Sequence, residues 1–160
     1  KLNTIQYRTH SDPWNTNYQS VDNFILAMYS KKQVTQMMLS TKTPYDKILY
    51  LRPDVKYLVK FNKKWITNTV YKNKILTPGF HHREYGINDR MACCSIDVAK
   101  IYGNVVDYLL ECSKMNPLHS ESVNKFILDS FKIPIIPIPF FFNRIRFDGT
   151  EKYEVGLSKE

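Results

Sequence analysis

YDKILYLRPDV, residues 45–55, is the stretch that decides the fold, because the apolar strand pattern over 47–51 ends there in a charged Arg-Pro-Asp turn. Pro53 has no backbone N–H to donate to a sheet, and it favours extended geometry at Arg52. The sequence therefore predicts a short strand with Arg52 and Asp54 at its tip. In open α/β sheets, ligands bind in the crevice beyond the carboxyl ends of the strands. A basic and an acidic side chain at that place suit a phosphorylated ligand.

The segments around this strand show helical and strand patterns in turn. Upstream, apolar residues between Val21 and Leu39 recur at helical spacing, and Ser20 is the predicted N-cap. A loop over 41–44 connects this helix to the strand. Downstream, the sequence predicts three short strands, over residues 55–61, 65–70 and 74–76. A loop is predicted over residues 79–88.

The C-terminal half is predicted to contain two helices and a closing strand. Ser95 opens the clearest helical pattern, which runs to about residue 115. Ser120 is the predicted cap of a second helix, and 135–142 is a predicted strand that its prolines place at the edge of a sheet. This order of elements indicates an α/β fold, and a length of 160 residues suits one domain over residues 1–160.

The composition is that of a globular chain without a membrane span. Hydrophobic residues make up 43% of the chain and charged residues 24%, and no run of eighteen apolar residues occurs. The first ten residues are too polar for a signal sequence. The cysteines, Cys93, Cys94 and Cys112, have the spacing of neither a disulfide framework nor a zinc site. We therefore expect a reducing, cytoplasmic location.

The positive charge of the chain is mostly scattered. A scattered net charge of +8 mainly affects solubility and does not by itself indicate a polyanionic partner, so a nucleic-acid partner is not expected. Between Lys56 and Lys74, however, lysines alternate with aromatic and apolar residues. An alternative hypothesis is therefore a basic nucleic-acid-binding protein that stacks bases on Tyr57, Trp65 and Tyr71.

Two further polar clusters follow the Arg-Pro-Asp turn, GINDRMA at 86–92 and LHSE at 118–121. Asp89 fits either a ligand contact or a turn, since Asn and Asp side chains bond their own backbone. His119 fits either a metal ligand or a residue at a helix N-terminus. The charged pair at the strand tip likewise fits either a ligand contact or an ordinary surface salt bridge.

Taken together and in this order, these motifs and NRIRFDG at 143–149 resemble a group of small GT-A-type nucleotide-sugar glycosyltransferases found in bacteria and large DNA viruses. In that group an R-x-D strand end stands where other members carry Asp-x-Asp, an NDR or NDQ follows, and HSE closes the set. The resemblance covers about residues 17–149. It implies a GT-A-like mixed sheet flanked by helices, and transfer of a sugar from a nucleotide-sugar donor to a glycan or protein acceptor. A large DNA virus is the expected source, which would place the protein in the cytoplasm of an infected host cell.

The resemblance also implies roles for five residues. Arg52, Asp54 and Arg90 would face the diphosphate of the nucleotide sugar, and Asp89 would be the catalytic base near the acceptor. His119 would lie beside the diphosphate or its metal, so that Asp54 and His119 would hold Mn²⁺ or Mg²⁺. Arg52 replaces the first aspartate of Asp-x-Asp, and a guanidinium that takes the place of the metal is the alternative.

The chain departs from the group in its N-terminal part. Members have two or more strand-helix units before the diagnostic strand, whereas about forty-five residues precede it here. We therefore expect either a shortened nucleotide-binding half or the C-terminal part of a longer GT-A domain. A non-catalytic binding or structural module of this fold is the corresponding alternative function.

Overall fold

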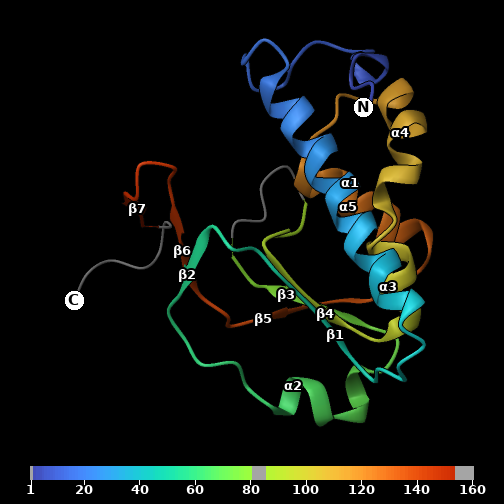
Figure 1. Cartoon of the computed structure of the whole chain (residues 1–160), viewed down its shortest axis with the longest axis vertical. Helices are drawn as coiled ribbons and strands as arrows, with labels where there is room; N and C mark the ends of the chain where they lie inside the picture. The colour runs from blue at the N-terminus through green and yellow to red at the C-terminus, as the bar shows by residue number, and fades with distance from the viewer. Residues whose placement is uncertain (1, 81–85, 154–160) are drawn as a thin grey trace.

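The computed structural model of the chain describes residues 2–80 and 86–153 (Figure 1). These residues form a mixed α/β structure with a four-stranded mixed sheet and a three-stranded antiparallel sheet. The α-helices are α1 (Gln19–Ser40), α2 (Lys64–Thr67), α3 (Ile96–Tyr102), α4 (Leu109–Met115) and α5 (Ser120–Ser130). The strands are β1 (Ile48–Leu51), β2 (Val55–Tyr57), β3 (Ile75–Pro78), β4 (Met91–Cys94), β5 (Ile135–Ile138), β6 (Phe142–Ile145) and β7 (Glu151–Lys152).

The larger sheet has the strand order β1-β4-β3-β5. Strand β4 runs antiparallel to both β1 and β3, and β5 runs parallel to β3. Because β1 and β4 are antiparallel, the end of β1 and the start of β4 lie at the same edge, with Leu51 opposite Met91. The chain then crosses to the smaller sheet, whose order is β2-β6-β7.

The larger sheet is covered on both faces, as Figure 1 shows with α1, α3 and α5 on one side and α2 on the other. On the helical side, Ala92 and Cys94 pack in a core cluster with Ala99 of α3. On the opposite side, Met91 and Cys93 pack in a cluster with aromatic residues of the α2 side. Every residue of β4 is buried, which explains why it lacks the alternating pattern by which half-buried strands are predicted.

Helix α1 begins where the sequence places it, although its cap is different. Tyr18 precedes the helix in a left-handed conformation, φ 64°. The carboxylate of Asp12 accepts hydrogen bonds from the backbone N–H groups of Trp14, Thr16 and Tyr18. The prediction of Ser20 as N-cap is wrong, because Ser20 lies inside the helix and donates its N–H to the Thr16 hydroxyl at 3.0 Å.

The strand predicted over 65–70 is also wrong. The segment forms helix α2 and a short 3₁₀ helix, Thr69–Tyr71. Asn62 accepts the N–H of Lys64 and Asn68 accepts the N–H of Val70, so two asparagine side chains close turns where the strand was expected.

The long helix and the closing strand are each broken in two. The expected helix from Ser95 stops at Tyr102, and a 3₁₀ turn, Val105–Tyr108, precedes α4. At Gly103 an added Cβ would lie 2.2 Å from the Thr35 hydroxyl oxygen, so α1 approaches there too closely for any side chain.

The predicted strand at 135–142 ends at residue 138 as β5, and the chain continues as β6 in the other sheet. The edge position of β5 is confirmed. The predicted strand at 55–61 is shorter, as β2, and part of the loop predicted at 79–88 lies outside the described residues. The helices in the described ranges are all too short or too polar to cross a lipid bilayer.

Candidate functional site

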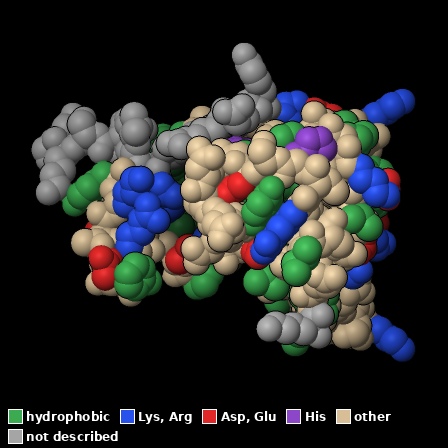
Figure 2. Space-filling model, turned by 90° about the horizontal axis from the view of Figure 1, so that it is seen from above, with side chains coloured by type: hydrophobic (Ala, Val, Ile, Leu, Met, Phe, Trp, Pro, Cys, Tyr) green, Lys and Arg blue, Asp and Glu red, His purple; other side chains and the backbone are tan. Residues whose placement is uncertain are grey.

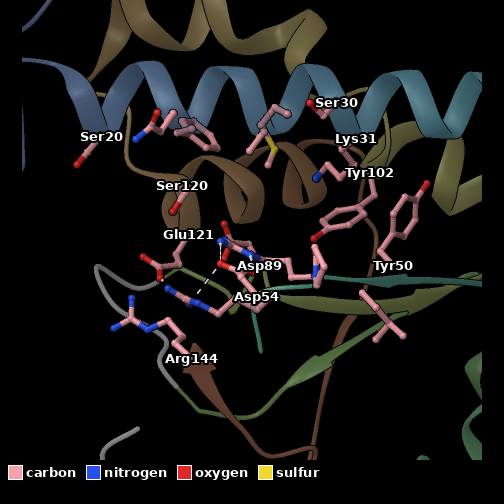
Figure 3. Close-up of a pocket in the computed structure, with 18 of the residues that line it drawn as sticks. Ser20, Ser30, Lys31, Tyr50, Asp54, Asp89, Tyr102, Ser120, Glu121 and Arg144 are labelled. Atoms are coloured by element: carbon pink, nitrogen blue, oxygen red, sulfur yellow. Dashed lines mark hydrogen bonds and ion pairs between the residues drawn. The ribbon is translucent and has the colours of Figure 1, made fainter. Parts of the chain in front are cut away.

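A pocket of about 940 Å³ opens between α1, the tip of β1, the residues before β4 and the start of α5 (Figure 3). The residues singled out in the sequence all line it: Arg52, Asp54, Asp89, Arg90 and His119. The structure thus brings together motifs from three separate parts of the chain. Their roles in ligand binding remain predictions.

Two features of the backbone cause this convergence. The antiparallel pairing of β1 and β4 sets the residues after Leu51 beside those before Met91. Gly86 then lies directly against the start of α5, since an added Cβ would be 2.3 Å from the carbonyl carbon of Glu121. The N–H of Ile87 donates to the Glu121 carbonyl oxygen at 3.1 Å, which fixes the approach to β4 against the helix.

The charged pair at the tip of β1 is bidentate. Arg52 donates from Nε to Asp54 Oδ1 at 2.8 Å and from Nη2 to Asp54 Oδ2 at 2.5 Å. These hydrogen bonds lower the pKa of the Asp54 carboxyl. The two side chains are 43% and 44% exposed, so the pair contributes little to stability and remains open to a ligand. The pair is therefore a salt bridge that also lines the pocket, and its contact with a ligand stays a prediction.

On the other side of the pocket, four ionisable side chains lie within ion-pair distance of their neighbours. Arg90 Nη1 lies 3.7 Å from Asp89 Oδ1 and 3.5 Å from Glu121 Oε1, and His119 Nδ1 lies 3.3 Å from Glu121 Oε2. The side chains of Asp89 and Glu121 are each 8% exposed. Burial, and then the neighbouring charge of Asp89, raise the pKa of the Glu121 carboxyl. Glu121 belongs to the HSE motif, but no role in binding or catalysis was predicted for it from the sequence.

Two nitrogen atoms of this cluster lack a hydrogen-bond partner among the described residues, Arg90 Nε and His119 Nδ1. The ring of His119 stacks on Trp14, with 5.0 Å between ring centroids and 25° between the planes. Glu121 is within ion-pair distance of His119 Nδ1 but lacks the alignment of a hydrogen bond. Buried polar atoms without partners are uncommon, and here they border a pocket that can admit an anion or water.

Asn88 performs the turn-forming role that was considered for Asp89. The Asn88 side chain is fully buried, donates to the Phe80 carbonyl oxygen at 2.9 Å and accepts the N–H of Arg90 at 3.1 Å. Because Asn88 closes the turn, Asp89 can present its carboxylate to the pocket, as Figure 3 shows.

The pocket also contains charged residues that the sequence analysis missed. Lys31 extends from α1, and Arg144 comes from β6 of the smaller sheet. Arg144 lies in the NRIRFDG motif, and its place in that motif could have identified it as a pocket residue. Lys31 had no such signal, since a lysine in a helix ordinarily extends into solvent.

The donor set does not fit the expected divalent ion. Both carboxylate oxygens of Asp54 are held by Arg52. Across residues 2–80 and 86–153, no three side chains of His, Cys, Asp or Glu are grouped so that they could hold a metal ion. Asp54 and His119 line the same pocket, but they would need a third ligand and the release of Asp54 from Arg52.

Of the residues in the stacking strip of the nucleic-acid hypothesis, Trp65 is buried and Tyr57 and Tyr71 are half-buried. Trp65 is only 8% exposed and packs edge-to-face on Phe61 and Phe140. Tyr57 packs against Phe140 and Phe142. Lys and Arg side chains stand in separate groups on the face seen in Figure 2, with Asp and Glu side chains between them. This view is from the end of the molecule opposite α2, so it shows the scattered charge of the chain and not the residues of α2.

The site therefore combines guanidinium groups, buried carboxylates and an imidazole nitrogen that has no hydrogen-bond partner among the described residues, around a cavity of small-ligand size. This arrangement can bind an anionic group and, at the same pocket, accept a proton from a neutral one. Comparisons with models of protein families, with curated proteins and with solved structures gave no significant match for this chain.

Proposed function

We propose that this chain is a glycosyltransferase that moves a sugar from a nucleotide-sugar donor to a glycan or protein acceptor. The observation that supports the proposal most is that three motifs, far apart in sequence, border one pocket. Their order is the order in which they stand in the GT-A-type group that the sequence resembles. A GT-A-like arrangement, with a shortened nucleotide-binding half, is part of the same proposal.

In the proposed reaction, an acceptor hydroxyl oxygen attacks the anomeric carbon of the donor sugar. The bond from that carbon to the phosphate oxygen breaks, and the nucleoside diphosphate leaves with the electron pair. The hydroxyl proton passes to the Asp89 carboxylate, which is buried at the pocket and close to Arg90.

Charge develops on the leaving diphosphate, and the arginines of the pocket can stabilise it. Arg90 presents a guanidinium group that can bind phosphate oxygens in bidentate fashion, and Arg52, whose Nε and Nη2 already bind Asp54, can offer its Nη1. Arg90 still has a hydrogen-bond donor, Nε, without a partner among the residues that the structure describes. The proposed reaction includes no step that depends on the Mn²⁺ or Mg²⁺ expected from the resemblance, because both carboxylate oxygens of Asp54 are bound by Arg52.

The experiment that tests the function is titration calorimetry with UDP-, GDP- and TDP-sugars, with and without Mn²⁺. We expect at least one of these nucleotide sugars to bind, and a mixture with acceptor glycans to release the nucleoside diphosphate. Binding without turnover by any acceptor would favour the non-catalytic module of the same fold. No binding at all would reject the glycosyltransferase proposal.

We expect transfer to persist in excess chelator, and Arg52→Ala to lower kcat/KM by roughly 30- to 800-fold. The reason is that a charge-assisted clamp on phosphate contributes on the order of 2 to 4 kcal/mol of transition-state stabilisation. The measurement is the initial rate of nucleotide release with and without EDTA. Lys56→Ala is the control, since Lys56 pairs with Glu151 and does not line the pocket. Activity that disappears in EDTA and returns with Mn²⁺ would instead support a metal.

A further inference from the structure

Lys31 occupies the end of the pocket that lies farthest from Arg144 in Figure 3. Its side chain leaves α1 and extends toward Tyr102, so that Nζ lies 3.6 Å from the centroid of the Tyr102 ring. Nζ also lies 3.3 Å from Asn124 Oδ1, and Asn124 is fully buried. A π face and an amide oxygen are thus the groups that contact this amine.

No carboxylate lies within ion-pair distance of Lys31 among the described residues. The next residue, Lys32, is different because its Nζ lies 2.5 Å from Asp107 Oδ1. Burial lowers the pKa of Lys31 to about 7, against an opposing effect of the Asp89 charge. An amine in this position is stable when it is neutral, or when a negative charge is brought to it.

We propose that Lys31 and the Tyr102 hydroxyl form an oxyanion subsite, in which a phosphate or carboxylate group of the ligand supplies the counter-ion that no described residue provides. The Tyr102 side chain is almost fully buried, and Figure 3 shows its hydroxyl directed into the pocket. No hydrogen bond of this hydroxyl occurs within the described ranges, so it can donate to an oxyanion. The subsite does not depend on glycosyl transfer, since any anionic ligand could use it.

Binding at this subsite couples to the proton equilibrium of Lys31. A bound anion favours the ammonium, so it raises the pKa of Lys31 from about 7 and the complex takes up a proton near neutral pH. Affinity for the anion should therefore fall as the pH rises above 7.

The other groups that face Lys31 do not compete for this proton. From β1 and α3, Tyr50 and Tyr102 stay protonated because burial raises the pKa of each phenol. From β4, burial raises the pKa of the Cys94 thiol to about 12. From α5, Asn124 does not titrate, and Asp89 is the carboxylate whose charge acts on the amine.

The first test is competitive acetylation of the wild-type protein near neutral pH, followed by peptide mass mapping. A neutral amine reacts and an ammonium does not, so Lys31 should be acetylated at least about tenfold faster than Lys32. Inorganic pyrophosphate and D-glucuronate are the probes. Protection of Lys31 by pyrophosphate would identify a phosphate subsite, and protection by glucuronate a carboxylate subsite. Lys32 should not be protected by either.

The second test uses the variant Lys31→Met, with Lys32→Met as the matched control. Titration calorimetry of the protecting anion in HEPES and in Tris gives the protons taken up on binding. We expect uptake in the wild type and in Lys32→Met, and in Lys31→Met a loss of uptake with affinity at least about tenfold weaker. The Tm of Lys31→Met should stay close to that of the wild type, because removal of a buried amine is favourable whereas the buried Asn124 Oδ1 loses its donor.

Three results would overturn the subsite: acetylation of Lys31 as slow as that of Lys32, no protection by either anion, or unchanged proton uptake in Lys31→Met. If nucleotide sugars fail to bind while pyrophosphate still protects Lys31, the glycosyltransferase proposal fails and the subsite stands. The two proposals can therefore be rejected separately.

Discussion

Asp89→Asn is expected to lower the rate of sugar transfer by about 10²- to 10⁴-fold, the usual contribution of a positioned general base. The amide keeps the size of the carboxylate, but it replaces one acceptor oxygen by an NH₂ donor and cannot accept the proton of the acceptor hydroxyl. Asp89 is only 8% exposed and lines the pocket, with Arg90 Nη1 at 3.7 Å. The measurement is kcat with the donor identified by titration, together with thermal unfolding.

Asp97→Asn is the matched control for this variant. Asp97 lies in the first turn of α3, is largely exposed and pairs with Lys100 at 3.0 Å. It should leave kcat unchanged. If Asp89→Asn retained full kcat with a normal melting curve, Asp89 could not be the base, and Glu121 would be the next carboxylate of the pocket to test.

Gly86→Ala is expected to lower the free energy of unfolding by about 3 kcal/mol, at the upper end of the usual range for overpacking. The new Cβ would lie 2.3 Å from the carbonyl carbon of Glu121 and 2.5 Å from the backbone nitrogen of Ser122. Both atoms belong to the backbone of α5, so the clash cannot be relieved by a side-chain rotation. The measurement is urea unfolding, and ligand binding should weaken as well because the approach to β4 would move.

Gly79→Ala provides the comparison. There an added Cβ would meet Pro137 Cβ at 3.3 Å and the Ile138 carbonyl oxygen at 3.4 Å, which a small adjustment can accommodate. Its effect on stability should be clearly smaller. If the two alanine variants lost equal stability, the close contact with α5 would not be the reason that glycine is required at position 86.

The parts of the site that were predicted from sequence are those with a strong local signal. Pro53 has no N–H to donate to the sheet and stands within a charged turn, so the position of Arg52 and Asp54 at a strand tip follows from the local sequence. Asp89 lies beside them because β1 pairs with β4, and His119 does because Gly86 and Ile87 contact the start of α5; only the motif order indicated this.

The parts that were not predicted depend on long-range packing. Residues 65–70 have the β-branched and aromatic composition of a strand, yet Asn62 and Asn68 close helical turns around them. Strand β4 is buried on both faces, so it lacks a period that could be recognised. Lys31 was not predicted to line the pocket. The apolar positions of a helix indicate its buried face, but they do not indicate which polar side chain lines a pocket.

The chain passes between the two sheets three times, and two of these connections contain a proline, whereas the third leads from β2 through α2 to β3. The turn with Pro53 leads from β1 to β2, and the segment with Pro139 leads from β5 to β6. The Ile145 N–H also donates to the Asp54 carbonyl oxygen at 2.9 Å, which ties the strand that carries Arg144 to the Arg-Pro-Asp turn. These links hold Arg144 beside the turn that carries Arg52 and Asp54. A guanidinium from the smaller sheet and the charged pair at the end of β1 therefore line the same part of the pocket, so an anionic ligand bound there would contact groups from both sheets.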